Sequence, residues 1–249
     1  MRVILSYSQF LKTYKTRGYR LKHLKNYKKL FPIRSSPGLA GIVADLIGDG
    51  HLQGDPKWRI DFTSNSTSEL KRFEKEMKTL FNVEGKIRKC LSNKYQTYNM
   101  AINSSPISRI LYLCGVPAGQ KVLTPFEIPK WIKKDKECFR RFCQRLFSCE
   151  GNIDCYKDRK IPQVRIEMWK YKKIINDGES FMKDINIYMK KYFNINSLVR
   201  VQKKENIRRD GVITKPVRLY IFKDSVINFY KGVGFEGNKQ ESLKVLLNI

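Results

Sequence analysis

Two segments of the sequence resemble each other at a separation of 101 residues (150 − 49). Residues 39–50 and 142–151 are each an apolar run of helical character, and each run ends in a carboxylate followed by glycine, Asp49-Gly50 and Glu150-Gly151. A helix that recurs with one acid per copy predicts a duplicated chain whose two halves meet at a common axis. This duplication restricts the possible folds more than any other feature of the sequence.

The composition predicts a folded protein with a polyanionic partner. A chain of 249 residues can hold one large domain or two of roughly 100–120 residues. With 41% hydrophobic and 12% aromatic residues, it is not a disordered polycation. Fifty Lys and Arg against 23 Asp and Glu give a net charge of +27, which favours nucleic acid as the partner over a ribosomal or membrane-surface role.

The sequence also suggests where the protein works. No apolar run reaches the roughly 18–20 residues that a membrane helix needs, and no secretory signal opens the chain, so we expect no membrane partner. We expect a prokaryotic cytoplasmic, nucleoid-associated protein, with an organellar matrix as an alternative. The cysteines form no C-x2-C pair, which argues against zinc and favours reduced thiols; they are Cys90, Cys114, Cys138, Cys143, Cys149 and Cys155.

Residues 1–36 form a basic extension that contains no Asp or Glu. Its many Lys and Arg residues alternate with aromatic residues, and such a segment could lie along a phosphate backbone. An organellar transit peptide and a merely solvated extension are the alternatives. Apolar residues at helical spacing predict a short helix near 20–31.

After residue 36 the same order of elements occurs twice. The first copy is predicted as a helix over 38–48, strands over 51–54 and 58–63, a helix over 67–81, strands over 83–91 and 96–103, and a helix from 106 to 114. The second copy is predicted as a helix over 136–148, strands over 152–156 and 162–169, a helix over 178–193, strands over 197–205 and 215–223, and a helix over 225–231. The fold class is therefore α+β, with two pseudo-symmetric αββαββα repeats.

These motifs resemble those of the single-chain, two-repeat, archaeal-type LAGLIDADG homing endonucleases. Residues 42–50 (IVADLIGDG) and 143–151 (CQRLFSCEG) are similar to the two motif helices of that family, and residues 124–132 (TPFEIPKWI) resemble the link before its second repeat. The resemblance implies a first repeat over 37–124 and a second over 125–249. It also implies saddle-shaped DNA-binding sheets and motif helices packed at the pseudo-twofold axis.

The resemblance implies that Asp49 and Glu150 are catalytic and bind Mg²⁺ or another divalent cation such as Mn²⁺. Hydrolysis of a phosphodiester needs such ions, and hard ions prefer carboxylate oxygen. It also places Gly48 and Cys149 at the metal and makes Lys223 a catalytic lysine. The structural alternative is that each acid before a glycine is only a polar helix end.

Two charged residues in the motif helices need an explanation. Arg145 stands where the family usually has glycine, so its guanidinium must find an acceptor or extend toward phosphate, since an unpaired buried charge is costly. Asp45 could pair with Arg145, or face outward. For Asp45 we favour a structural role over a catalytic one.

The predicted strands alternate polar and apolar residues, which is typical of a sheet with one face on helices and the other toward a ligand. Arg and Lys on such a ribbon read guanine in the major groove, and Gln or Asn reads adenine. The alternative for any single residue is a solvated sheet face. The candidate DNA-binding residues are Lys86, Arg88, Tyr98, Arg165, Arg200, Gln202, Lys203, Arg208, Arg209, Arg218 and Tyr220.

The sequence thus predicts a monomeric, metal-dependent endonuclease that cleaves double-stranded DNA at a long, specific site. The chain begins with Met and ends Leu-Leu-Asn-Ile, so an intron-encoded or free-standing enzyme is expected rather than an intein. A catalytically silent DNA-binding protein and a maturase that binds intron RNA remain alternatives. The sequence has two histidines and no phosphate-binding loop motif, so a His-based triad or a P-loop enzyme is disfavoured.

Overall fold

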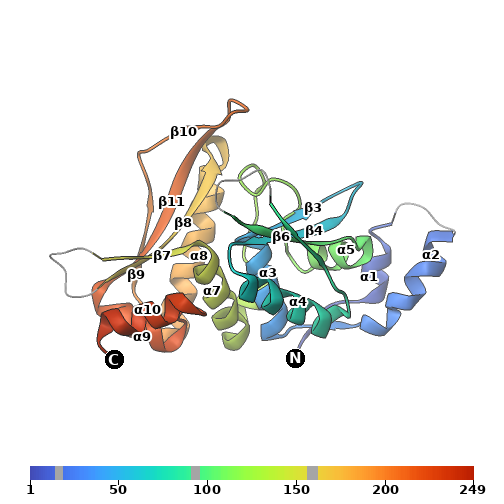
Figure 1. The fold of residues 1–249 in the computed structure, drawn as a ribbon, viewed down its shortest axis with the longest axis horizontal. Coiled ribbons are helices and arrows are strands. Elements are labelled where there is room, and N and C mark those ends of the chain that lie inside the picture. Colours follow the sequence, from blue (N-terminus) through green and yellow to red (C-terminus); the bar gives the residue numbers. More distant parts are fainter. Residues whose placement is uncertain (15–18, 91–95, 156–161) are drawn as a thin grey trace. The chain divides into compact units, whose positions relative to one another are not determined.

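The computed structural model describes residues 1–14, 19–90, 96–155 and 162–249. The chain divides into two compact units, Met1–Gly119 and Gln120–Ile249 (Figure 1). The predicted boundary between the repeats, at 124/125, lies five residues later. Each helix of the described residues is too short or too polar to cross a membrane.

The first unit contains one complete αββαββα repeat behind a folded N-terminal segment. Its motif helix begins where the Ser36 hydroxyl accepts a hydrogen bond from the Leu39 amide (3.2 Å) and where Pro37 occupies the first helical position. The elements are β1 (Val3–Leu5), α1 (Tyr7–Leu11), α2 (Tyr19–Leu24), η1 (Lys25–Leu30), β2 (Ile33–Arg34), α3 (Pro37–Ile47), β3 (Gly50–Gln53), β4 (Arg59–Ser64), α4 (Thr67–Phe81), β5 (Lys86–Lys89), β6 (Tyr98–Ile102) and α5 (Ser105–Leu113).

The second unit repeats this order and then extends it. Its motif helix begins at Asp135, whose carboxylate accepts a hydrogen bond from the Cys138 amide (2.9 Å). The elements are α6 (Lys130–Lys133), α7 (Lys136–Glu150), β7 (Gly151–Asp154), β8 (Gln163–Tyr171), η2 (Lys172–Ile174), α8 (Ile175–Phe193), β9 (Ser197–Val201), β10 (Asn206–Ile207), β11 (Ile213–Ile221), η3 (Lys223–Ser225), α9 (Val226–Gly232) and α10 (Asn238–Leu247).

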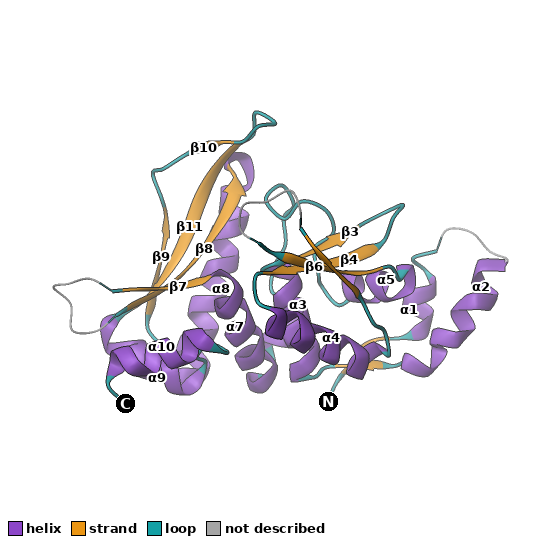
Figure 2. Ribbon diagram, in the orientation of Figure 1, coloured by secondary structure: helices purple, strands orange, loops and turns teal. Residues whose placement is uncertain are grey.

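The two sheets share one topology, which confirms the predicted duplication. The first sheet has the antiparallel order β3-β4-β6-β5, and the second has the order β7-β8-β11, with β9 and β10 both paired to β11 (Figure 2). In each unit the two hairpins are therefore joined by pairing of the second strand of the first hairpin with the last strand of the second, β4 with β6 and β8 with β11. The α+β fold of two αββαββα repeats is confirmed; that the two motif helices pack against each other stays a prediction.

In each unit one sheet face packs on helices and supplies the core. In the first unit Ile60, Phe62 and Met100 are fully buried, and the Phe62 ring stacks on Phe73 of α4 with ring centroids 4.5 Å apart. In the second unit Val164, Ile166, Val217 and Leu219 face the helices in the same way. The alternation predicted from the sequence thus leaves the other face of each sheet open.

The described part of residues 1–36 is folded onto the first unit. Phe10 of α1 is completely buried and contacts the Phe31 ring at 5.1 Å, so these aromatic side chains form a small core and do not stack on bases. Arg109 of α5 donates a hydrogen bond to the Thr13 carbonyl oxygen (2.6 Å). The helix expected near 20–31 is present as α2 and η1, while Lys15 and Arg17 lie outside the described residues.

Several predicted elements differ from those observed. The strand expected over 197–205 ends at Val201, and the short β10 resumes pairing with β11 five residues later. The last strand, predicted to end at Lys223, ends at Ile221. Lys223 is instead the first residue of η3. We predicted no element after residue 231, whereas α10 spans Asn238–Leu247.

Candidate metal and nucleic-acid site

Each predicted acid lies at or just after the end of its motif helix. Helix α3 ends at Ile47, and the exposed Asp49 follows after Gly48, whose amide donates to the Ala44 carbonyl oxygen (2.8 Å). Helix α7 continues to Glu150, which is half-buried, and Gly151 caps it. In both units the acid lies directly before the first strand of the sheet. The structure therefore presents Asp49 and Glu150 at equivalent places in the two repeats.

The glycine after each acid is required for close packing. A Cβ at Gly50 would lie 2.7 Å from the Leu46 Cα, and a Cβ at Gly151 would meet the Phe147 carbonyl oxygen and lie 2.9 Å from Phe235 Cε1. In both cases the obstacle includes the residue four positions earlier in the motif helix. Gly151 has φ −84°, so available space and not a left-handed backbone selects glycine here.

The donors at these helix ends suit a hard divalent ion only in part. Mg²⁺ typically keeps several waters and takes one or two carboxylates together with phosphate oxygens, so one acid per unit fits an ion that substrate and water complete. Within the ranges the structure describes, no group of three or more His, Cys, Asp or Glu side chains is placed to hold a metal. Gly48 is buried and Cys149 half-buried next to these acids, and a thiol is a poor ligand for Mg²⁺.

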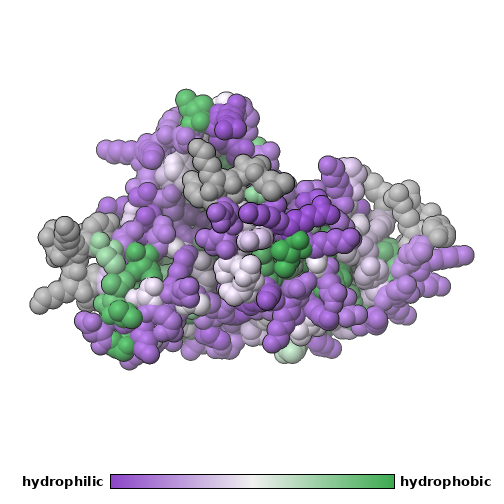
Figure 3. Space-filling model, viewed as in Figure 1, coloured by the Kyte–Doolittle hydropathy of each residue, from purple (hydrophilic) through white to green (hydrophobic). Residues whose placement is uncertain are grey.

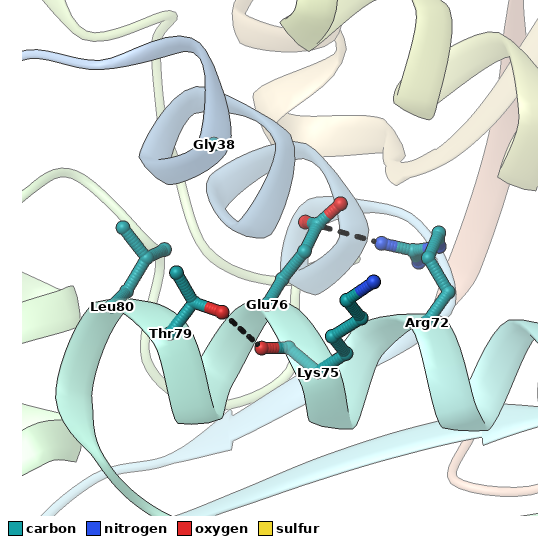
Figure 4. A pocket seen from close by; sticks show the side chains of 6 residues that line it. All are labelled: Gly38, Arg72, Lys75, Glu76, Thr79 and Leu80. Atoms are coloured by element: carbon teal, nitrogen blue, oxygen red, sulfur yellow. Dashed lines mark hydrogen bonds and ion pairs between the residues drawn. The ribbon is translucent and has the colours of Figure 1, made fainter.

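Asp45 is completely buried in α3, and its partner is Arg72 of α4. Arg72 Nη1 lies 2.9 Å from Asp45 Oδ2 and 3.3 Å from Glu76 Oε2, with Glu69 beside it as well. Burial opposes the charge of Arg72, but these carboxylates outweigh it and raise the pKa of the guanidinium. Figure 4 shows Arg72 and Glu76 at the edge of a pocket of about 310 Å³. Asp45 thus has a counterion within its own unit, which supports a structural role, and its pairing with Arg145 of the other unit stays a prediction.

Arg145 is completely buried in α7, and its partner is Glu236 in the loop between α9 and α10. Arg145 Nη1 donates to Glu236 Oε2 at 2.5 Å, and Arg141 pairs with the other carboxylate oxygen of Glu236. The guanidinium at the position where the family usually has glycine is thus neutralised inside its own unit. The expectation that the Arg145 guanidinium finds an acceptor is therefore met.

The same C-terminal segment holds the end of α7. The Glu236 amide donates to Ser148 Oγ (2.9 Å), and Lys239 Nζ donates to the carbonyl oxygens of Ser148 (2.7 Å) and Gly151 (2.9 Å). Sequence reasoning missed both residues because it predicted no element after residue 231. Gly237 followed by leucines at 243 and 247 was the available signal for α10, in which Leu243 is buried.

The open face of the first sheet carries part of the predicted DNA-binding set. Lys86 and Arg88 are exposed, and the register pairs them with Ala101 and Asn99 of β6. Tyr98 alternates with Asn99 along β6 and therefore lies on the opposite, helix-covered face, apart from Lys86 and Arg88; its contact with DNA stays a prediction.

The open face of the second sheet brings together half of the remaining set, Arg165, Arg200, Arg218 and Tyr220. Arg218 is paired by register with Arg200 on one side and Glu167 on the other, and Tyr220 is paired with Arg165. Arg218 donates to Glu167, while Arg165 donates to Asp154 Oδ2 at 2.5 Å, which raises the pKa of Arg165. This face is therefore a cationic surface whose guanidinium groups are partly ordered by carboxylates.

The other predicted residues lie at the margins of this sheet. Gln202 and Lys203 follow the end of β9, and Arg209 is exposed in the turn after β10. Arg208 in the same turn donates to Gln120 Oε1 (3.0 Å) and pairs with Asp210 (3.2 Å). Figure 3 shows that hydrophilic side chains cover most of the molecular face in view.

Lys223 does not lie beside Glu150. Gly151, Ile166 and Leu219 share one row across the sheet, and Lys223 comes four residues after Leu219. The register therefore separates Lys223 from the start of β7 by two strand spacings, about 10 Å, as well as by those four residues. Asp61 of β4 accepts a hydrogen bond from Arg59 Nε (2.9 Å).

Comparisons with known proteins identify two relatives that match most of this chain. No family model matches it. The tRNA-splicing ligase RtcB of Methanopyrus kandleri is 23% identical over 243 residues, which cover 91% of this chain and 24% of that protein. The replication factor C small subunit of Methanocaldococcus jannaschii is 27% identical over 214 residues, which cover 80% of this chain and 11% of that protein. The chain thus spans only a minor part of each relative.

Solved structures similar to this chain come from two groups of proteins. A mesophilic variant of the homing endonuclease I-DmoI superposes with a TM-score of 0.54 at 16% identity, covering 84% of this chain and 97% of that one. I-DmoI in complex with DNA and Mn gives a TM-score of 0.51 at 17% identity, covering 79% and 96%. Full-length DUF199/WhiA from Thermatoga maritima gives 0.52 at 16% identity, covering 88% and 63%. The chain has the LAGLIDADG fold.

Proposed function

We propose that the protein is a site-specific endonuclease that hydrolyses both strands of duplex DNA with divalent metal ions. The observation that carries this proposal is the duplicated helix end: in each unit one carboxylate, Asp49 or Glu150, lies at the point where a motif helix meets a sheet with an open polar face. I-DmoI, which has the same fold, is a homing endonuclease that has been crystallised with DNA and Mn or Ca.

The charge of the open faces supports duplex DNA as the partner. Lys86 and Arg88 in the first unit, and Arg200 in the second, are exposed on faces that carry no helix. With a net charge of +27, the chain gains affinity for DNA mainly through phosphate contacts and the release of counterions. A long target read by two sheets and a monomeric state form part of this proposal.

Asp49 and Glu150 are the residues that would hold the metal ions, one in each unit. A bound divalent ion would stabilise the charge that develops on the phosphate oxygens and on the leaving oxygen. The chain's own part is to present each carboxylate at a fixed helix end, with Gly50 and Gly151 allowing the strand to leave the helix without a steric clash. Mg²⁺ and Mn²⁺ are the ions that suit these oxygen donors.

The names of the two sequence relatives do not describe this function. One relative is a ligase and the other a replication factor, yet this chain matches both over most of its own length and over 24% or less of theirs. A segment common to two proteins with different activities is a module, so neither named activity is part of our proposal.

The test uses wild type, Asp49→Asn and Glu150→Gln with a library of duplexes, in Mg²⁺ or in EDTA. We expect wild type to cut a selected duplex only with the metal, and each variant to lose cleavage of at least one strand while retaining binding. The nuclease proposal fails if wild type binds one duplex tightly and cuts none. The assignment of the acids fails if both variants cut like wild type.

A catalytically silent DNA-binding protein is the second candidate. Two observations favour it: the WhiA chain, which is not called an endonuclease, has the same fold, and the described residues hold no group of three metal ligands. In that case the selected duplex stays intact in Mg²⁺ while binding persists. A maturase would instead bind folded intron RNA in preference to duplex DNA, which a competition experiment with the two nucleic acids distinguishes.

A further inference from the structure

Helix α10 and the loop before it attach to the motif helix of the second unit. Glu236 pairs with Arg145 and Arg141, its amide binds Ser148 Oγ, and the Phe235 carbonyl oxygen accepts from Gln144 Nε2 at 3.5 Å. These contacts run along about two turns of α7, from Arg141 to Ser148 near its end. The C-terminal segment therefore binds the motif helix along the half that leads to Glu150.

Lys239 makes the contact nearest to the predicted acid. Its Nζ donates to the carbonyl oxygens of Ser148 (2.7 Å) and Gly151 (2.9 Å), so it binds the backbone on both sides of Glu150. The last carbonyl groups of a helix lack partners within the helix, and a cation there also interacts favourably with the helix dipole. A single side chain thus fixes the last turn of α7 and the first residue of β7.

The position of Lys239 in its own helix makes this contact more informative. It is the second residue of α10, where a positive charge is unfavourable to the helix dipole. The unfavourable placement at the start of α10 is offset by the two hydrogen bonds to the end of α7. Lys239 therefore stabilises the end of α7 and does not stabilise α10.

The first repeat has no equivalent of this arrangement within its described residues. No helix follows α5 in the resolved 96–119 stretch of that unit, and the Asp49 carbonyl oxygen instead accepts from the Thr63 amide of β4 at 3.4 Å. Among the described contacts, the backbone at Asp49 is bound by its own sheet, whereas the backbone on both sides of Glu150 is bound by a lysine 89 residues later in the chain (239 − 150).

We propose that Lys239 is a positioning residue for Glu150, and that it supports cleavage of only one of the two DNA strands. This inference rests on the proposed endonuclease function. Lys239 acts through the backbone that carries Glu150 and does not itself touch DNA or metal. The half-site of Asp49 is independent of it.

The test compares Lys239→Met, Lys239→Arg and the control Lys244→Met, an exposed lysine further along α10. Strand-specific nicking rates are measured on the selected duplex, and amide hydrogen exchange is measured over residues 148–153. We expect Lys239→Met to slow the strand that depends on Glu150 by about 10- to 100-fold, the range for groups that orient a metal-binding carboxylate. It should also speed exchange at 148–153, whereas Lys239→Arg restores part of both and Lys244→Met changes neither.

The outcomes separate this inference from the endonuclease proposal. Equal slowing of both strands, or no slowing with unchanged exchange, overturns the role of Lys239 while leaving the nuclease intact. If wild type cuts neither strand, the nuclease proposal fails, and the exchange measurement alone decides: unchanged exchange in Lys239→Met then overturns the positioning role as well. Glu150→Gln, which should slow the same strand, identifies the strand that depends on Glu150.

Discussion

Arg145 and Glu236 form an ion pair across 91 residues of sequence, with the guanidinium completely buried and the carboxylate 22% exposed. Removing the carboxylate takes away the counterion that the second unit supplies to this buried charge. We therefore expect Glu236→Gln to lower the free energy of unfolding by about 3–5 kcal/mol. Urea unfolding followed by circular dichroism measures this change.

The reverse substitution should cost less. In Arg145→Met the carboxylate of Glu236 keeps Arg141 and reaches solvent, so no buried charge is stranded. A loss as large as that of Glu236→Gln would contradict this account. Glu241→Gln, an exposed position in α10, serves as the control and should be neutral.

Two glycine substitutions, one directly after α7 and one in the first turn of α3, should have opposite effects. Gly151→Ala places a Cβ against the Phe147 carbonyl group and Phe235, so it should destabilise the second unit markedly. At Gly38, in the first turn of α3, a Cβ meets only Leu80 at 3.9 Å, so Gly38→Ala should stabilise the protein by about 0.5–1 kcal/mol. Thermal unfolding of both variants tests the pair, and a stable Gly151→Ala protein would refute the close-packing explanation.

Lys170 should make stability depend on pH in the alkaline range. Its Nζ is buried against the carbonyl oxygens of Lys121 (3.0 Å) and Thr124 (2.7 Å), and burial lowers the pKa of the ammonium below 10.5, although Asp177 partly opposes this. Between the lowered pKa and 10.5 the unfolded chain binds more protons than the folded one. The contribution of Lys170 to stability therefore rises with pH across that interval.

Urea unfolding of wild type and Lys170→Met at about pH 7 and about pH 10 isolates the contribution of Lys170. The two pH values differ in how much of the folded-state Lys170 is deprotonated. The difference in unfolding free energy, wild type minus variant, should increase toward the alkaline end. A difference that falls with pH would mean that the folded state stabilises the ammonium instead.

The six cysteines should react with thiol reagents in a fixed order. Cys155 is exposed, Cys90 and Cys149 are half-buried, and Cys114, Cys138 and Cys143 are buried. Burial raises the pKa of the Cys114 and Cys138 thiols to about 12, so they carry little thiolate at neutral pH. Mass spectrometry after brief alkylation should find Cys155 modified first and the buried three only in urea.

Arg200 should contribute to DNA affinity irrespective of sequence. Because it is exposed on the open face beside Arg218, Arg200→Gln should weaken binding to unrelated duplexes alike and reduce the slope of log affinity against log salt by about 0.9. Fluorescence anisotropy at several salt concentrations measures the slope. Lys244→Gln, at the C-terminal helix, is the matched control and should leave it unchanged.

The repeated pattern made the sheets and motif helices predictable from sequence. Pro37 and the carboxylate-glycine pairs gave helix ends that lie within two residues of those observed, since capping and close packing depend on local residues. The strand register could not be predicted, and it placed Tyr98 on the helix-covered face and Lys223 away from Glu150. Register is decided by pairings between distant strands.

The partners of the buried charges were equally inaccessible to sequence reasoning. Asp45 and Arg145 were recognised as needing explanation, but a single sequence offers many possible counterions to each. The partners that the structure shows within each unit, Arg72 and Glu236, come from α4 and from the loop before α10. Helix α10, which follows Glu236, was missed because the repeat pattern ends before it.

The two motif helices also differ in how soon during synthesis each buried charge can meet its counterion. Asp45 and Arg72 are 27 residues apart (72 − 45), so the first buried charge meets its counterion soon after it is translated. Arg145 must wait for Glu236, which follows 91 residues later (236 − 145). During synthesis the second motif helix therefore stays without this counterion for more than three times as many residues as the first, and a chain released before residue 236 lacks the Arg145–Glu236 pair.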